Sequence, residues 1–455
     1  MNKYYFNFNH KVLLIIFFLL IPNLAVSNSN KNFELALKNA LNNSAELVSA
    51  KYLFESKKKL ILSAYSGKDW NSSFTSTLTA NNKKYDHSGS FTDETTNLNI
   101  ISLKKKLFDG GFTENEVEIA TNNFNLEKNN FLLTEQKILF KTITSYLELY
   151  KSNKIEKLRS INVDKFLKHV NASKLKLKAG TITPTTVAEA EARLARSEYE
   201  LILAKTEREN FKNEFLSIVG EGFNISGLKL PFTKFILPET MDEAIKLAFD
   251  NNPLILNNQI KKNISLLERN KSISVNKPSL EIDFQYKYSE SSSSSSSNDF
   301  SSYGTILTFK TPLFYNKSQK HLILSLNDKF RSIVQEEREV QRNVKLNVSS
   351  AFNNYKNSFL NTKAASKELK AAKLALKGVQ KEEEYGIRTL LEVLDNEVNV
   401  VNAEVNILKS KCNEILQKFN LKTKIGTLVI SDIVKNFRVK YPYEKDFKIP
   451  SLIAF

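Results

Sequence analysis

The feature that most constrains this chain is a stretch of sequence that occurs twice. The segment "LKLKAGTITPTTVAEAEARLARSEYELILAK" contains Gly180, and "EEEYGIRTLLEVLDNEVNVVNAEVNILKSK" contains Gly386, 206 positions later. When the two glycines are superposed, Val393 falls on Val187 and Glu397 falls on Glu191. Each copy is a glycine–threonine turn that leads into a helical pattern. A repeat at this distance indicates a chain built from two similar halves.

Three further pairs of segments follow in the same order at nearly the same distance. "FELALKNALNNSAEL" matches "MDEAIKLAFDNNPLI", "KLFDGG" matches "PLFYNK", and "SYLELYK" matches "AFNNYKN". The chain has only 12 Gly and 9 Pro, which favours long uninterrupted elements. We predict five parts: a signal peptide (1–27), a first repeat (28–227), a linker (228–239), a second repeat (240–433) and a C-terminal tail (434–455).

The first 27 residues have the three-part layout of a secretory signal peptide. A basic start precedes the apolar run "VLLIIFFLLIP", and small residues at Ala25 and Ser27 suit cleavage after Ser27. The apolar run is too short to span a bilayer comfortably, and no later stretch approaches the length of a transmembrane helix. We expect an exported protein without membrane helices, with a retained N-terminal anchor as the alternative.

Nothing in the sequence indicates catalysis or a bound cofactor or metal. The single Cys412 excludes an intramolecular disulfide, and His87, His169 and His321 have no close partners at metal-ligand spacing. No nucleophile elbow, phosphate-binding loop or zinc-protease motif occurs. The formal charge of +17 is compatible with nucleic acid, an acidic membrane surface, anionic cargo or a lysine-rich proteome.

Alternating sequence predicts two β-hairpins, at about 71–108 and 279–314. Such alternation is typical of a strand with lipid on one side and water on the other, although a half-buried strand in a soluble sheet is the alternative. A flexible serine-rich loop, Ser289–Ser302, separates the strands of the second hairpin. The segment "SLEIDFQYKY" shows the pattern best, with Leu280, Ile282, Phe284, Tyr286 and Tyr288 on one face and Glu281, Asp283, Gln285 and Lys287 on the other.

Four strands cannot close a barrel in a membrane, where every backbone polar group needs a partner. Three chains would supply twelve strands, an even number within the known range. Two long apolar series with steps of three and four residues also predict antiparallel helices joined through the turn at Gly386. The first contains Phe352, Tyr355, Phe359, Thr362, Leu369, Ala372, Leu376 and Val379, and the second contains Leu394, Val398, Val401, Val405, Leu408, Cys412, Ile415 and Phe419.

From about Phe33 to about Ile433 the chain resembles the TolC-type outer-membrane efflux channel family. The resemblance is carried by "AGTITPTTVAEAEARL", "YGIRTLLEVLDNEVNVVNAEVN", the paired "LF" strand ends and "KIGTL". It implies a mixed α and β membrane protein: a homotrimer whose twelve-stranded outer-membrane β-barrel, four strands per chain, continues into a periplasmic α-helical coiled-coil barrel. It also implies contact with outer-membrane lipid, a periplasmic adaptor protein and an inner-membrane pump, and no nucleic acid.

The two glycine–threonine turns are, on this resemblance, the hairpin tips at the inner end of the tunnel. Gly180 and Gly386 can adopt φ > 0, and Thr183 or Thr185, and Thr389, can cap the helix that follows. The requirements of a tight turn alone would explain these residue types. The docking of an adaptor protein at the tips is implied only by the family resemblance. The predicted docking residues are Gly180, Thr183, Thr185, Gly386, Thr389 and Leu390.

The resemblance also places a gate at these tips. It puts the lock arginine at Arg388 and rings of carboxylates at Glu392 and Asp395, whose spacing of three residues puts them on one helical face. A solvated face with an Arg388–Glu392 pair is the alternative. The chain departs from many relatives at Thr186 and Glu383, so we expect a rewired or weaker lock, with Glu383 or Glu189 receiving Arg388.

Two function classes remain open from the sequence. The first is the exit duct of a tripartite efflux or type I secretion system. The second is a periplasmic coiled-coil structural or adaptor protein. The alternating segment at Leu280 favours the duct, because an adaptor has no need of a lipid-facing strand pair in each half.

Overall fold

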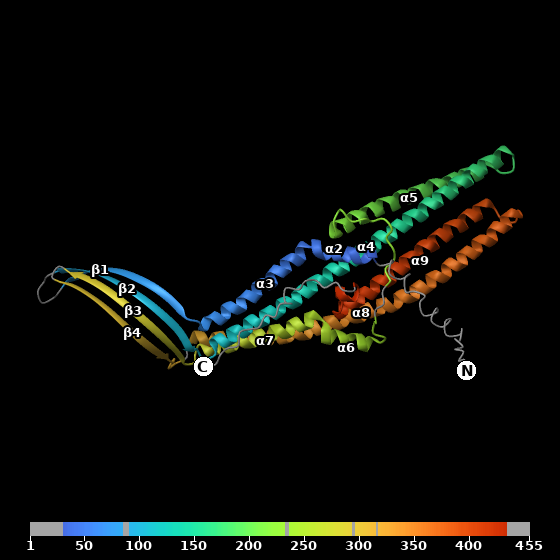
Figure 1. The fold of residues 1–455 in the computed structure, drawn as a ribbon. Coiled ribbons are helices and arrows are strands. Elements are labelled where there is room, and N and C mark those ends of the chain that lie inside the picture. Colours follow the sequence, from blue (N-terminus) through green and yellow to red (C-terminus); the bar gives the residue numbers. More distant parts are fainter. Residues whose placement is uncertain (1–30, 85–90, 233–235, 294–295, 315–316, 435–455) are drawn as a thin grey trace, which may run out of the picture. The chain divides into compact units, whose positions relative to one another are not determined.

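The computed structural model describes residues 31–84, 91–232, 236–293, 296–314 and 317–434. The predicted signal peptide lies outside these residues, as does the predicted C-terminal tail except Val434. The same order of elements, two helices, two strands and two helices, occurs twice (Figure 1). The first half contains α2 (Lys31–Asn43), α3 (Ala45–Tyr65), β1 (Asn71–Lys84), β2 (Phe91–Phe108), α4 (Phe112–Lys178) and α5 (Pro184–Val219).

The second half repeats this order after the linker. The longest helices of the two halves, α4 and α8, have 67 and 68 residues, in keeping with the scarcity of glycine and proline. The second half contains α6 (Met241–Asn251), α7 (Pro253–Ser274), β3 (Ser279–Ser293), β4 (Ser297–Lys310), α8 (Lys317–Glu384) and α9 (Leu390–Ile425). Short 3-10 turns occupy Ser66–Lys68 and Ile430–Asp432.

The four strands form one antiparallel sheet in the order β1-β2-β3-β4 (Figure 1). The two hairpins are joined where β2 pairs with β3, with Ile101 opposite Tyr286 and Leu103 opposite Phe284. Both predicted hairpins are therefore present. The second hairpin differs in two details: β4 ends at Lys310 rather than Phe314, and strand pairing extends through Ser293 and from Ser297. Most of the segment predicted as a flexible loop is therefore strand, because backbone pairing continues regardless of side-chain type.

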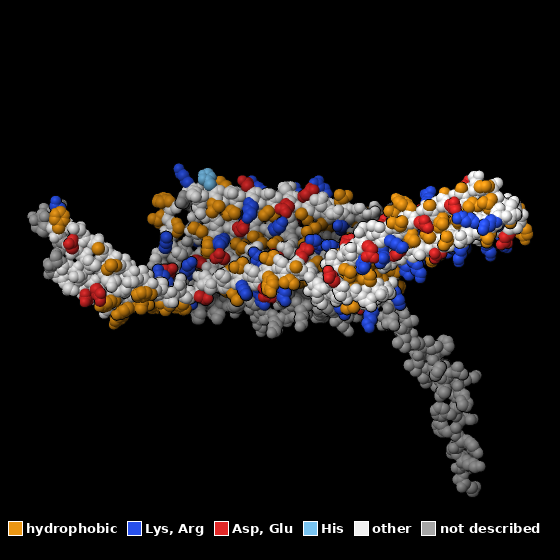
Figure 2. Space-filling view, turned by 90° about the horizontal axis from the view of Figure 1, so that it is seen from above, with side chains coloured by type: hydrophobic (Ala, Val, Ile, Leu, Met, Phe, Trp, Pro, Cys, Tyr) orange, Lys and Arg blue, Asp and Glu red, His pale blue; other side chains and the backbone are white. Residues whose placement is uncertain are grey.

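The two faces of the sheet are inverted relative to a soluble protein. Phe284 and Tyr286 are 41% and 46% exposed, whereas Asp283 on the opposite face is only 5% exposed. The Asp283 carboxylate accepts a hydrogen bond of 2.6 Å from the hydroxyl of Ser102, which is also buried. Hydrophobic side chains gather along one side of the sheet (Figure 2). This pattern is the one predicted for a strand pair with lipid outside and water inside.

Contacts divide the chain into two compact units, each of which takes segments from both repeats. Of the described residues, one unit contains those within 31–45, 135–250 and 346–434, and the other contains those within 46–134 and 251–345. The first unit has an aromatic core in which Phe33 lies edge-on to Tyr146, with ring centroids 5.1 Å apart. Phe419 and Phe215 extend this core at 6.1 Å and 6.0 Å. Helices α2, α4, α5 and α9 are thus joined through one set of rings.

In the second unit, helices pack through aromatic and ionic contacts. Phe54 of α3 lies 4.7 Å from Phe124 of α4, measured between ring centroids. Lys262 of α7 forms an ion pair of 2.8 Å with Glu337 of α8. Among the residues that the structure describes, no helix combines the length and apolar character needed to cross a bilayer.

The seam predicted between α8 and α9 is largely confirmed. On α9, Leu394, Cys412 and Phe419 are buried, as the three-four spacing predicts. On α8 the prediction was wrong at Phe359, which is 57% exposed, because Ser358 takes the inward position and is 1% exposed. The hydroxyl of Thr362 donates to the carbonyl oxygen of Ser410 at 3.2 Å, which fixes α8 against α9.

Candidate functional site: the tips of the two helix hairpins

The two hairpin turns have the same backbone geometry. Gly180 and Gly386 both have φ = +73°, a region that L-residues with a side chain rarely adopt. The N–H of Thr181 donates to the carbonyl of Lys176 at 3.0 Å, and the N–H of Ile387 donates to the carbonyl of Glu382 at 2.8 Å. A β-carbon built at either glycine would meet no atom within 4 Å, so conformation rather than space requires glycine.

Threonine caps the helix that follows each turn. Thr183 accepts a hydrogen bond from the N–H of Thr186, and Thr389 accepts one from the N–H of Glu392, each at 3.4 Å. Glu392 returns the interaction, because its carboxylate accepts from the N–H of Thr389 at 2.9 Å and completes a capping box. The capping prediction is confirmed for Thr183 and Thr389. Thr185 is exposed inside the first turn of α5 and is not the cap.

Arg388 is held by two carboxylates of its own hairpin. Its Nε lies 3.0 Å from Glu382, and its Nη1 lies 2.7 Å from Glu392. These hydrogen bonds raise the pKa of Arg388 above its ordinary value. The pKa of Glu392 is lowered, first by the backbone hydrogen bond from Thr389 and then by the hydrogen bond from Arg388.

The receivers that we expected for Arg388 are not its partners within the chain. Glu383 instead lies 3.3 Å from the Nζ of Lys176 on α4. Glu189 is exposed on α5 and has no contact with Arg388 within the described residues. The hydroxyl of Thr186 lies 3.1 Å from that of Thr183, so it serves the capping turn. Helix rotation brings Glu382, one residue before the expected Glu383, to the arginine.

Asp395 forms a link between the two hairpins. Its carboxylate lies 2.6 Å from Nη1 of Arg193, which projects from α5. Glu392 and Asp395 do share a side of α9, but within the protomer each carboxylate already has an arginine partner. Arg193 was not among the residues predicted from the sequence. The sequence shows an arginine in a helix, but local spacing cannot predict an acidic partner that lies on a helix far away in sequence.

A further cross-hairpin contact is partly buried. Nε2 of His169 on α4 lies 3.2 Å from a carboxylate oxygen of Glu397 on α9, and Glu397 is only 5% exposed. An apolar cluster of Phe166, Val170, Ala190 and Leu394 surrounds this level of the hairpins. Among the described residues, the polar contacts that join the two hairpins include Lys176–Glu383, Arg193–Asp395, His169–Glu397 and, further from the tips, a hydrogen bond of 3.4 Å from Arg159 to Asn402. An apolar cluster lies at the same level as His169 and Glu397.

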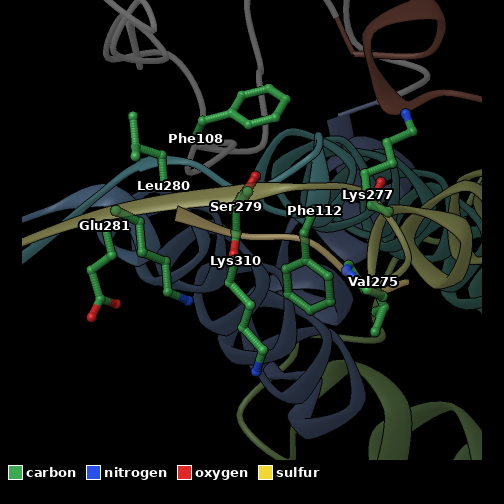
Figure 3. Close-up of a pocket in the computed structure, with 12 residues that line it drawn as sticks. Phe108, Phe112, Val275, Lys277, Ser279, Leu280, Glu281 and Lys310 are labelled. Atoms are coloured by element: carbon green, nitrogen blue, oxygen red, sulfur yellow. The ribbon is translucent and has the colours of Figure 1, made fainter. Parts of the chain in front are cut away.

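Other parts of the molecule show less chemistry. No group of three or more His, Cys, Asp or Glu suited to a metal ion occurs among the described residues. Burial raises the pKa of Cys412 to about 12, which makes its thiol a poor nucleophile. A cavity of about 290 Å³ lies at the helix end of the sheet (Figure 3). Phe108, Phe112, Lys277 and Lys310 are among its lining residues.

Comparison with known proteins identifies the family. The sequence model of the family described as "Outer membrane efflux protein" matches residues 36–221 and 245–426. The two matched segments correspond to the two copies of the repeat. The match covers well over half of the chain, so the chain belongs to the outer membrane efflux protein family.

Individual relatives agree with this assignment. The outer membrane efflux protein BepC of Brucella suis is 22% identical over 340 residues, covering 74% of each chain. The outer membrane protein TolC of Escherichia coli is 20% identical over 317 residues, which span 66% of this chain and 63% of that protein. The structure of the outer membrane protein VceC of Vibrio cholerae matches with a TM-score of 0.72 at 14% identity, covering 86% of this chain and 95% of that one.

The family fixes the class of protein and its place in the cell. The chain is an outer-membrane exit duct for efflux, located in the outer membrane of a Gram-negative envelope with its helical part in the periplasm. The mixed α and β fold with four strands per chain is confirmed. Of the two function classes that the sequence left open, the family selects the duct rather than a periplasmic structural or adaptor protein. The family is one of channel proteins.

Proposed function

We propose that three copies of this chain form one channel, in which three sheets close a twelve-stranded barrel. The observation that carries this proposal is the sheet itself, which has apolar side chains on one face and two terminal strands, β1 and β4. Among the described residues, neither terminal strand pairs along its outer edge. An unpaired strand edge is not tolerated in lipid, so each edge requires a strand from another copy.

Aromatic and lysine residues at the end of the sheet next to the helices indicate that one boundary of the membrane lies at this end. Trp70 packs 5.8 Å from Phe284, measured between ring centroids, and Nζ of Lys105 lies 5.5 Å from the centre of the Trp70 ring. Tryptophan with a neighbouring lysine is typical of the interface between lipid and water. Substrate then passes from the periplasmic side to the outside through the lumen of the barrel, which is lined by polar residues.

The hairpin tips form the gate and the docking end. The polar contacts Lys176–Glu383, Arg193–Asp395 and His169–Glu397 hold the second hairpin against the first near the tips of each protomer, so their release would open the tip. Arg388, Glu392, Asp395, Thr186 and Glu383 form the gate together with Arg193, Lys176 and His169. The docking surface for a periplasmic adaptor comprises Gly180, Thr183, Thr185, Gly386, Thr389 and Leu390. Ile387 and Tyr385, 72% and 81% exposed, supply apolar contact area beside it.

Two measurements test this function. Detergent-extracted protein should have the mass of a trimer by light scattering. An epitope inserted at Ser296, between β3 and β4, should bind antibody on intact cells. An epitope at Gly180 is the matched control and should bind antibody only after lysis. A monomeric mass, or a Ser296 epitope that stays hidden until lysis, would contradict the proposed trimeric barrel.

Passive conduction with an inner-membrane pump is tested separately. Deleting the gene should sensitise cells to the compounds or block the secretion that the pump serves. Wild-type protein restores export, whereas a variant that still trimerises but lacks the docking residues should not. Full export by such a variant would show that docking does not occur at these tips.

A further inference from the structure

A stripe of lysines runs along one face of α8. Counting in alternate steps of four and three residues from Lys356 gives positions that all lie on one side of an α-helix. Every one of these positions is exposed, and none is acidic. Leu360 and Leu374 within the stripe are 59% and 72% exposed. The α8 stripe consists of Lys356, Leu360, Lys363, Lys367, Lys370, Leu374, Lys377 and Lys381.

The α8 stripe points away from the partner helix α9. The seam with α9 passes through Thr362 and Ala365, and Lys373 beside the seam forms an ion pair of 2.7 Å with Glu404 of α9. At 3.6 residues per turn, Lys363 and Lys367 each lie about 160° from Ala365 around the helix axis. Among the described residues, no carboxylate pairs with the lysines at 363, 367, 370, 377 and 381.

A complementary stripe occurs on α5. Ala188, Glu191, Ala195, Glu198 and Ile202 follow the same three-four spacing, and all are exposed. Arg193, which binds α9, projects about 160° away from Ala195. The α5 stripe and the α8 stripe are therefore both turned away from the contacts with α9, although Glu191 of the α5 stripe binds Lys174 of α4. Two different faces of one protomer suit head-to-tail contact, which closes into a ring.

The acidic residues of the α5 stripe and the lysines of the α8 stripe lie at equal distances from the hairpin tips along the helix axes. Helix α5 begins at Pro184 and α8 ends at Glu384, and Lys176–Glu383 holds the two tips at one level. Glu198 and Lys370 are each 14 residues from these ends, and Glu191 and Lys377 are each 7 residues from them. Leu374 and Ala195 lie between the two charge pairs. Both helices rise about 1.5 Å per residue, so the matches hold along the axis.

We propose that the α8 stripe docks on the α5 stripe of a second copy of this chain. The contact places Lys370 against Glu198 of the neighbouring copy, Lys377 against Glu191, and Leu374 against Ala195. Glu191 also binds Lys174 in its own chain at 2.7 Å, so it would be shared, whereas Glu198 has no ionic partner within the described residues. This assignment rests on the proposed trimer and specifies which helices meet between copies.

Engineered cysteines test the contact directly in the full-length protein. Leu374→Cys together with Ala195→Cys should give covalent dimers and trimers on mild oxidation, and each single variant should give none. Leu360→Cys with Ala195→Cys is the matched control. Its two positions lie on the same faces but differ by 13 residues in height, about 20 Å along the axis, so no cross-link should form.

A charge exchange tests the polar match. Lys370→Glu should weaken the trimer, seen as dissociation at a lower temperature in detergent, and Glu198→Lys should do the same. The double variant Lys370→Glu with Glu198→Lys should restore the dissociation temperature. Lys367→Glu with Glu198→Lys places its charges three residues out of register and should not restore it.

The outcomes separate this contact from the trimer itself. Trimers by light scattering without the Leu374–Ala195 cross-link, or without charge rescue, would overturn the α8–α5 contact and leave the channel in place. In that case the α8 stripe would be a solvated face or the docking face for an acidic partner protein. Rapid labelling of Leu374→Cys by a bulky thiol reagent in intact trimers would overturn it as well. A monomeric mass would contradict the proposed function instead.

Discussion

Nη1 of Arg193 on α5 lies 2.6 Å from the carboxylate of Asp395 on α9. This pair joins the two hairpins of one chain, whereas among the described residues Arg388 bonds to Glu382 and Glu392 on its own hairpin. Within a protomer, Arg193 is therefore one of the residues that restrain the second hairpin, together with Lys176 and His169. The lock arginine that the family resemblance places at Arg388 stays a prediction, because its contacts with a neighbouring copy are outside a single chain.

Arg193→Ala should open the tip more readily than Arg388→Ala. Both partners of the Arg193–Asp395 pair are partly exposed, and such a pair contributes about 0.2–1 kcal/mol, at most about a fivefold change in the ratio of open to closed tips. Single-channel conductance in planar bilayers measures the change. Arg196→Ala is the control, since Arg196 lies on the same helix and its nearest acidic contact is 3.8 Å away within that helix. Equal effects of Arg193→Ala and Arg196→Ala would rule out a specific lock.

Cation selectivity at the tip should persist to unusually low pH. Hydrogen bonds from Thr389 and Arg388 lower the pKa of Glu392, so its charge is present above that pKa and is lost as pH falls through it. Reversal potentials should stay constant through the ordinary glutamate range and shift only below it. Glu392→Gln with Asp395→Asn should reduce selectivity at neutral pH and remove this low-pH change. The double variant retains the capping geometry, because Gln can replace Glu in a capping box.

Replacing glycine by alanine should lower the stability of the second hairpin at the turn but raise it inside the helix. Gly386→Ala should destabilise the second hairpin by about 1–2 kcal/mol, because alanine resists the left-handed backbone at φ = +73°. Gly378→Ala in α8 should instead stabilise it by about 0.5–1 kcal/mol, since Gly378 lies in open space within a helix. Protease resistance of the tips would report both changes. Destabilisation by both variants would show that a crowded contact, not backbone conformation, selects glycine.

Tyr146→Phe tests the core of the first unit. The Tyr146 hydroxyl donates to the carbonyl of Lys229 at 2.9 Å, and phenylalanine keeps the ring but removes that donor. We expect a loss of about 0.5–1.5 kcal/mol in the free energy of unfolding, measured by chemical denaturation. Burial also raises the pKa of Tyr146 to about 12, so its absorbance should not change until near that pH.

Tyr150→Phe is the matched control for that substitution. Tyr150 lies one turn further along α4, and Lys154 lies over its ring at 5.8 Å from the centre. Phenylalanine retains this contact, so the stability should change little. A similar loss in both variants would indicate that the Lys229 hydrogen bond is not the cause.

Local patterns predicted the parts of the structure that local forces determine. The turns at Gly180 and Gly386, the caps Thr183 and Thr389 and the alternation around Phe284 follow from backbone conformation and strand geometry. Phe359 was predicted to be buried because it is more hydrophobic than its neighbour Ser358 and fits the three-four spacing. In the structure Ser358 is the buried residue of the two. The partners of Asp395 and Glu397 were missed because they depend on the rotation and height of helices far apart in sequence.

The inverted sheet has a consequence for biogenesis. A newly exported chain that folded its four strands in the aqueous periplasm would present Phe74, Leu307 and Phe309, each more than half exposed, to water together with two open strand edges. Exposed apolar strands with open edges are prone to aggregate. Folding of the sheet is therefore coupled to its insertion and to its meeting with other copies. Until then the open edges and apolar face remain exposed, and the rate at which copies meet sets how long each nascent chain stays prone to aggregate.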